Sequence, residues 1–182
     1  MSRTEKFKLE KVSVRLVKDS PLLSDRKITQ PEDAIFLLSE ILKECDREVL
    51  CVINLKADGT PINCSVVSVG GLSSSIAHPR EILKSSILSN AANMILMHNH
   101  PSGDLSASQE DIMVTDRMAK LCNLVGIPLL DHVIVGNDGS RYFSFKEKEL
   151  VDFNKRDSVA YSMDMIDLGK VAERTSRKKL TR

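Results

Sequence analysis

Two of the chain's four histidines, His98 and His100, stand one residue apart, directly after a short apolar run. That run, residues 94–97, predicts a buried strand, and side chains two apart on an extended segment point the same way. A helical pattern begins near Ser108, which places Asp111 in the helix's first turn. Two imidazoles and one carboxylate match the ligand number of a catalytic zinc site with a position left for water. Surface or helix-capping histidines would fit the same short pattern.

The spacing beyond the histidines is more specific. It reads His-x-His, seven residues, Ser, two residues, Asp, with Pro101 directly after the second histidine. This pattern resembles the JAMM signature of the JAB/MPN metalloprotease fold, and within that superfamily the chain resembles the RadC-like JAB domains. Similar blocks occur at residues 46–49, 78–81, 98–104 and 129–132. The resemblance covers about residues 29–150, and the family's usual N-terminal helix-hairpin-helix module finds no counterpart here.

The resemblance implies that His98, His100 and Asp111 bind Zn²⁺, although this ligand set also suits iron or manganese. Zinc lowers the pKa of a bound water from ~15.7 to ~7, and a separate carboxylate must then accept the proton. Upstream candidates are Glu44, Glu48 and Glu81.

Glu48 opens an apolar strand, and JAMM enzymes carry their catalytic Glu at such a strand start. The resemblance therefore implies Glu48 as the base, with a surface carboxylate as the alternative. For Ser108 it implies a hydrogen bond to the oxyanion, and a plain helix N-cap is compatible with that role.

Three further polar residues near these blocks have simpler interpretations. His132 stands in an apolar strand beside Asp131, which favours a core histidine or one hydrogen-bonded behind the ligands. His78 precedes a proline and is interpreted as a loop residue, and Asp104 as a turn residue.

Apolar periodicity predicts an α/β (mixed α+β) fold with a mixed sheet flanked by helices. The resemblance implies the JAB/MPN-like, cytidine-deaminase-like version of that architecture. Predicted strands cover residues 9–17, 48–55, 62–69, 94–97, 128–135 and 142–145. Predicted helices run from a capping box at Thr29 to about Glu44, from Pro79 to about Asn90, from Ser106 or Ser108 to Gly126, and over 146–153. The third helix should bury Ile112, Met113, Met118, Leu121, Cys122 and Val125. Beyond Lys155 we expect at most a marginal helix, with disorder from Thr175.

A chain of 182 residues suggests one domain with appendages. We expect an N-terminal strand and loop (1–28), a JAB/MPN metallohydrolase domain (29–150) and a basic C-terminal tail (151–182). No apolar run approaches the ~20 residues of a membrane span, and no signal peptide is recognisable. The four cysteines lack zinc-ligand spacing, so reduced thiols and a cytoplasmic location are expected.

Charge is unevenly distributed along the chain. Residues 1–18 carry six Lys/Arg and two Glu, and residues 155–182 carry eight Lys/Arg and four acids, whereas the stretch between them is acidic. Phosphates need neutralising cations, so any DNA contact would use the basic ends. Solubilising tails are the simpler interpretation of these ends.

The sequence therefore favours a zinc-dependent hydrolase that cleaves an amide, peptide or isopeptide, in a peptide or protein substrate. A DNA-associated RadC-type repair or mobile-element accessory protein is the first alternative. A non-catalytic JAB scaffold is the second, against which the intact ligand set argues. No membrane partner is expected, and the oligomeric state is open.

Overall fold

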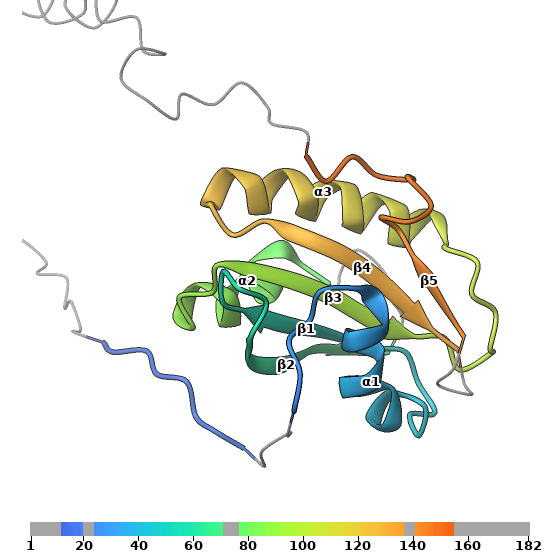
Figure 1. Cartoon of the computed structure of the whole chain (residues 1–182), viewed down its shortest axis with the longest axis horizontal. Helices are drawn as coiled ribbons and strands as arrows, with labels where there is room; N and C mark the ends of the chain where they lie inside the picture. The colour runs from blue at the N-terminus through green and yellow to red at the C-terminus, as the bar shows by residue number, and fades with distance from the viewer. Residues whose placement is uncertain (1–11, 20–23, 71–76, 137–140, 155–182) are drawn as a thin grey trace, which may run out of the picture.

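The structure, a computed structural model, describes residues 12–19, 24–70, 77–136 and 141–154. Its centre is a five-stranded mixed sheet in the order β2-β1-β3-β4-β5 (Figure 1). The strands are β1 (Val49–Leu55), β2 (Pro61–Val69), β3 (Asn93–Asn99), β4 (Leu129–Val135) and β5 (Tyr142–Ser144). Neighbouring strands are antiparallel except for β3 and β4, which run parallel.

In the described ranges three helices cover the sheet: α1 (Pro31–Leu42), α2 (Pro79–Leu88) and α3 (Gln109–Val125). Alternate side chains of β1 and β3 enter two separate apolar clusters, because successive strand residues face opposite sides. Leu50 and Leu96 pack with α2 and α3, whereas Cys51 and Met97 pack with α1. Every residue of β1 is buried, as expected for a strand covered on both faces. The predicted mixed sheet flanked by helices is confirmed.

The β3–α3–β4 unit makes the one parallel connection of the sheet. Ser108 caps α3 at its start, and Gly126 ends the helix in the left-handed conformation (φ 74°) that glycine adopts without a Cβ penalty. A crossover helix of this kind brings its N-terminus beside the carboxyl end of the preceding strand, the usual place for a site in an α/β sheet. The two histidines and Asp111 meet at that place.

The turn between β1 and β2 depends on Gly59. Its φ is 83°, and a Cβ at this position would lie 2.7 Å from the carbonyl oxygen of Ile28. The close approach exists because the Ile28 amide donates to the Gly59 carbonyl at 2.9 Å. The glycine therefore fixes both the hairpin and the chain that enters α1.

We expect Gly59→Ala to lower the free energy of unfolding by about 2 kcal/mol or more, since it combines an unfavourable φ with a backbone clash. Gly126→Ala is the matched control, because Gly126 also has a positive φ but nothing lies within 4 Å of its added Cβ. That variant should lose only about 1 kcal/mol. Urea unfolding of both variants measures the difference. Equal losses of unfolding free energy would contradict a destabilising contact between the added Cβ and Ile28.

Two predicted elements are wrong. Residues 12–17 of the expected strand over 9–17 are extended but pair with no strand of the described chain, and Val12 and Val14 are exposed. Apolar alternation indicates which face would be buried, but it supplies no partner strand. The expected helix over 146–153 is a series of turns, because Glu149 adopts a left-handed φ of 53° that a right-handed helix cannot contain.

Smaller corrections concern helix ends and faces. The N-cap of α1 is Gln30, one residue later than predicted, and the acid that accepts from the backbone is Asp33 rather than Glu32. The amide of Thr29 donates to Asp33 at 3.0 Å, and this bond holds the pKa of the carboxyl below its usual value. On α3, Met113 and Val125 are exposed. The buried positions are Asp111, Thr115, Met118, Ala119 and Cys122.

Among the described helices, none has both the length and the apolar character that a bilayer crossing needs. The cysteines that the structure describes are free thiols, two of them buried.

The expected marginal helix after Lys155 and the disorder after Thr175 concern residues outside the described ranges. DNA binding through the basic ends stays a prediction.

Candidate metal centre

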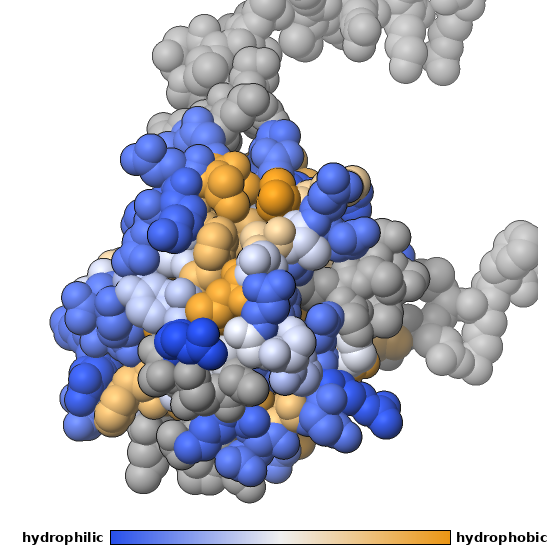
Figure 2. Space-filling model, turned by 90° about the vertical axis from the view of Figure 1, so that its right-hand side faces the viewer, coloured by the Kyte–Doolittle hydropathy of each residue, from blue (hydrophilic) through white to orange (hydrophobic). Residues whose placement is uncertain are grey.

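The end of β3 and the start of α3 build one polar cluster. His98 belongs to β3, His100 follows the strand directly, and Asp111 is the third residue of α3. Figure 2 faces this end of the molecule and shows hydrophobic and intermediate side chains across the middle of the face, bordered by hydrophilic ones. The structure thus brings together the three residues that the sequence singled out.

Within the described residues, this is the one group of three metal-ligating side chains that converges, with one ligand atom from each within 4.8 Å of the others. The Nε2 atoms of His98 and His100 are 3.0 Å apart. Asp111 places Oδ1 3.5 Å from Nε2 of His98 and Oδ2 3.8 Å from Nε2 of His100. Ligand atoms at zinc distances of ~2.0–2.1 Å and tetrahedral angles are about 3.3 Å apart. The group can therefore hold a metal ion with small adjustments.

Burial keeps the site's inner histidine neutral. His98 is fully buried, and desolvation lowers its pKa to about 4 despite the opposing attraction of Asp111. A neutral imidazole retains the lone pair that a metal requires. His100 is partly exposed, so the cluster opens to solvent on the side of His100.

Ser108 and Asp111 hold each other in a reciprocal cap. The Ser108 hydroxyl and amide both donate to Oδ2 of Asp111 at 2.7 Å, and the Asp111 amide donates back to the hydroxyl at 3.1 Å. This is the capping box of α3. It fixes the carboxylate beside the histidines and leaves Oδ1 turned toward His98. Of the two serines proposed as caps, Ser108 has this role rather than Ser106.

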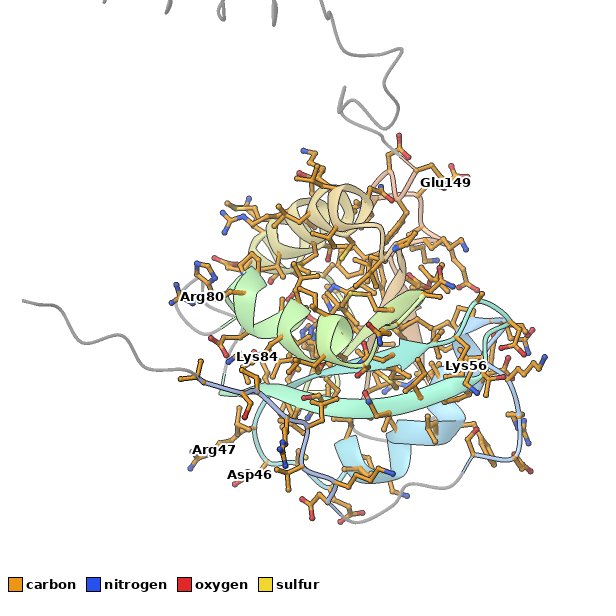
Figure 3. All side chains as sticks on the ribbon, turned by 90° about the vertical axis from the view of Figure 1, so that its left-hand side faces the viewer. Asp46, Arg47, Lys56, Arg80, Lys84 and Glu149 are labelled. Carbon is orange, nitrogen blue, oxygen red and sulfur yellow. The ribbon has the colours of Figure 1, made fainter. Side chains whose placement is uncertain are left out.

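Sequence reasoning missed Asn99, which lies between the two histidines and is buried. Its Oδ1 accepts from the amide of Val49 at 2.8 Å, and its Nδ2 donates to the carbonyl of Arg47 at 3.0 Å. These two backbone groups flank Glu48. The Arg47 side chain itself points away from the body of the protein (Figure 3). The sequence shows only an asparagine at the end of an apolar strand, which does not reveal these distant backbone partners.

Glu48 immediately precedes β1 and is half-buried. Leu50 of β1 pairs with His98 of β3, and the antiparallel register continued by two residues sets Glu48 opposite His100. Opposite residues of an antiparallel pair have their side chains on the same face. Leu50 belongs to the cluster on the α2 and α3 side, so Glu48 is assigned to the side of the sheet that carries the histidines.

The side chains of the other candidates do not belong to the converging group. Glu44 is exposed beyond the end of α1, and Glu81 pairs with Lys84 in the first turn of α2. Asp104 accepts from the Ser106 amide at 2.9 Å, as a turn residue does, and this bond lowers its pKa. His78 is not a simple loop residue, because its Nδ1 caps α2 by accepting from the Arg80 amide at 3.2 Å.

His132 lies behind the cluster and reaches no ligand position. Its Nε2 is 2.8 Å from Nδ1 of His98, and its Nδ1 is 2.5 Å from the Thr115 hydroxyl, which sequence reasoning also missed. Asp131 faces the opposite side and accepts from Ser144, the Lys146 amide and the His132 amide. Burial raises the pKa of Asp131. Its bonds join β4 to β5 and to the turn after β5.

Residues 28–150 match the family of the RadC-like JAB domain. The chain belongs to this family. It is 45% identical over 126 residues to a UPF0758 protein of Caldanaerobacter subterraneus subsp. tengcongensis, covering 69% of this chain and 53% of that protein. UPF0758 proteins of Clostridium acetobutylicum (48% over 125 residues) and Methanosarcina mazei (43% over 126 residues) each match 69% of this chain and 54% of their own length. The chain therefore spans about half the length of the curated relatives it matches.

Proposed function

We propose that this RadC-like JAB domain is a zinc-dependent hydrolase that cleaves an amide bond in a peptide or protein. The observation that carries the proposal is the convergence of His98, His100 and Asp111 next to a strand end that bears Glu48. Three ligands of this type leave a coordination position for the reacting molecule, as in catalytic rather than structural zinc sites.

The donor set fits a divalent cation. Two imidazole nitrogens and one carboxylate make up the donor set. The two Nε2 atoms are 3.0 Å apart, Oδ1 of Asp111 is 3.5 Å from Nε2 of His98, and Oδ2 is 3.8 Å from Nε2 of His100, so the separations lie around the tetrahedral value of about 3.3 Å. When bound, zinc supplies Lewis acidity, which makes water acidic enough to react near pH 7. The same three ligands can also bind iron or manganese, so the ligand types alone do not select zinc.

The chain's own residues would complete the reaction. Glu48 takes the proton from the attacking water and gives it to the leaving nitrogen as the amide bond breaks. Ser108 turns its hydroxyl from Asp111 to the carbonyl oxygen, where negative charge develops. Asn99 keeps Glu48 in place by binding the backbone on both sides of it. Asp111 retains the Ser108 amide as a donor when the hydroxyl turns away.

Chelation tests this proposal. Zinc-loaded protein should cleave members of a library of linear peptides and of peptides branched through a lysine side chain, with products identified by mass spectrometry. A chelator should stop cleavage and added zinc should restore it, because the three ligands alone supply no Lewis acid. Cleavage that continues in chelated protein, or zinc-loaded protein that cleaves no member of the library, would contradict the proposal.

A further inference from the structure

A row of buried polar groups continues from His98 away from the metal centre. Nδ1 of His98 is 2.8 Å from Nε2 of His132, and Nδ1 of His132 is 2.5 Å from the Thr115 hydroxyl. The same hydroxyl is 2.6 Å from the carbonyl oxygen of Asp111, one turn earlier on α3. All three side chains in the row are fully buried, so water does not compete for these bonds.

The last contact fixes the direction of every hydrogen bond in the row. A carbonyl oxygen only accepts, so the single hydroxyl proton of Thr115 goes to Asp111. The hydroxyl oxygen must then accept from Nδ1–H of His132. A neutral imidazole carries one proton, which leaves Nε2 of His132 as an acceptor. Nδ1 of His98 is consequently the protonated nitrogen, and its Nε2 carries a lone pair.

The opposite set of donors and acceptors is excluded at the Thr115 hydroxyl. If the hydroxyl donated to His132, two oxygen atoms would face each other at 2.6 Å with no hydrogen between them. A doubly protonated His132 is also disfavoured, because its ring is fully buried and a buried charge loses its hydration.

His100 is set in the same tautomer by a different partner. Its Nδ1 is 2.6 Å from the carbonyl oxygen of Asp104, which accepts a proton but cannot give one. With His100 neutral in this tautomer, both Nε2 atoms present lone pairs to each other across 3.0 Å, with a carboxylate beside them. Three electron-rich groups at these distances repel one another unless a cation lies among them.

We propose that Thr115 and His132 are positioning residues that hold His98 in the tautomer whose Nε2 can bind a metal. The proposal rests on the metal site of the proposed function, but it does not depend on hydrolysis. Thr115 is the key element, because one hydroxyl contacts the backbone of one candidate ligand, Asp111, and acts through His132 on another, His98. Partners behind a ligating histidine typically change metal affinity 10–100-fold.

Thr115→Val tests the proposal because it keeps the branched shape of the side chain and replaces the hydroxyl with a methyl group that can neither donate nor accept. His132 then has an unpartnered Nδ1 in either tautomer, so the form that donates to His98 becomes accessible. That form moves the proton of His98 to Nε2 and blocks the metal position. We expect the zinc dissociation constant to rise about 10–100-fold. In metal-free protein, ¹⁵N shifts of the imidazole nitrogens should move from a single Nδ1–H form toward a mixture.

Two further variants make the result specific. Thr115→Ser keeps a hydroxyl and should restore the wild-type tautomer and zinc affinity to within about threefold. Ser86→Ala removes another fully buried helix hydroxyl on the same side of the sheet, one that contacts Met94 instead of a histidine. It should leave both measurements unchanged. Thermal unfolding of each variant shows whether the fold is intact.

The inference is overturned if metal-free wild-type protein carries the His98 proton on Nε2. It is also overturned if folded Thr115→Val keeps the wild-type ¹⁵N pattern and zinc affinity. These outcomes differ from failure of the proposed function, because the tautomer is measured without metal or substrate. A protein that binds zinc with the expected tautomer and cleaves no peptide would refute the hydrolase and leave the positioning role standing.

Discussion

Replacing Asp111 with asparagine should abolish stoichiometric zinc binding while leaving the fold intact. An asparagine oxygen can still accept from the Ser108 amide and hydroxyl, so the cap of α3 survives. The substitution removes the site's one anionic ligand, and two neutral imidazoles alone bind zinc far more weakly. We expect the dissociation constant to rise by at least about 100-fold. Metal analysis of purified protein and competition with a chromophoric chelator measure the loss.

The same change should remove the stabilisation that zinc provides. A ligand present at about 100 times its dissociation constant stabilises the folded state by about 2.7 kcal/mol. Zinc should therefore raise the unfolding temperature of wild-type protein and leave that of Asp111→Asn unchanged. Asp116→Asn is the control, because Asp116 lies on the same helix but pairs with Lys120 outside the site. Equal zinc content in Asp111→Asn and wild type would remove the basis of the metal centre.

The convergence of His98, His100 and Asp111 was predictable because these residues are close in sequence. His98 and His100 share a strand end, and the Ser108 cap and Gly126 mark both limits of α3. Local patterns of this kind determine where a helix begins and which way neighbouring strand residues point. The loop between the strand and the helix is short enough to bring Asp111 back to the histidines.

The supporting residues were not predictable because their roles come from distant partners. Asn99 binds backbone groups of Arg47 and Val49, and Val49 lies 50 residues earlier in the chain. Thr115 contacts His132, which lies 17 residues later. Neither contact has a periodic signature. The buried face of α3 was misjudged for a related reason. Asp111 and Thr115 take positions toward the sheet that apolar periodicity would give to hydrophobic residues, and Met113 is left exposed.

Long-range contacts also explain the wrong helix after β5. The Lys146 amide donates to Asp131 and the Glu147 amide to Ser144, so the chain is held against β4 at the point where the helix was expected to begin. Glu149 then adopts a left-handed φ of 53°, which a right-handed helix cannot contain. Helix propensity over residues 146–150 is favourable, but it is weaker than these tertiary bonds.

Glu48→Gln should separate catalysis from metal binding. Glutamine has nearly the same shape as glutamate but cannot accept and pass on a proton, so turnover of a cleaved peptide should fall about 100–10,000-fold. Zinc content should stay at the wild-type level, because Glu48 is not among the three converging ligands. Single-turnover cleavage of a peptide identified from the library, together with metal analysis of the same sample, measures both quantities.

Glu44→Gln is the matched control for this variant. Glu44 is the same residue type four positions earlier, exposed beyond α1, and it should keep both activity and zinc. The contrast depends on the strand register, because Leu50 opposite His98 assigns Glu48 to the histidine side of the sheet. If Glu48→Gln retained full turnover with zinc bound, the proton would have to move through another group. The pairing of β1 with β3 would then have no catalytic role beyond supporting the ligands.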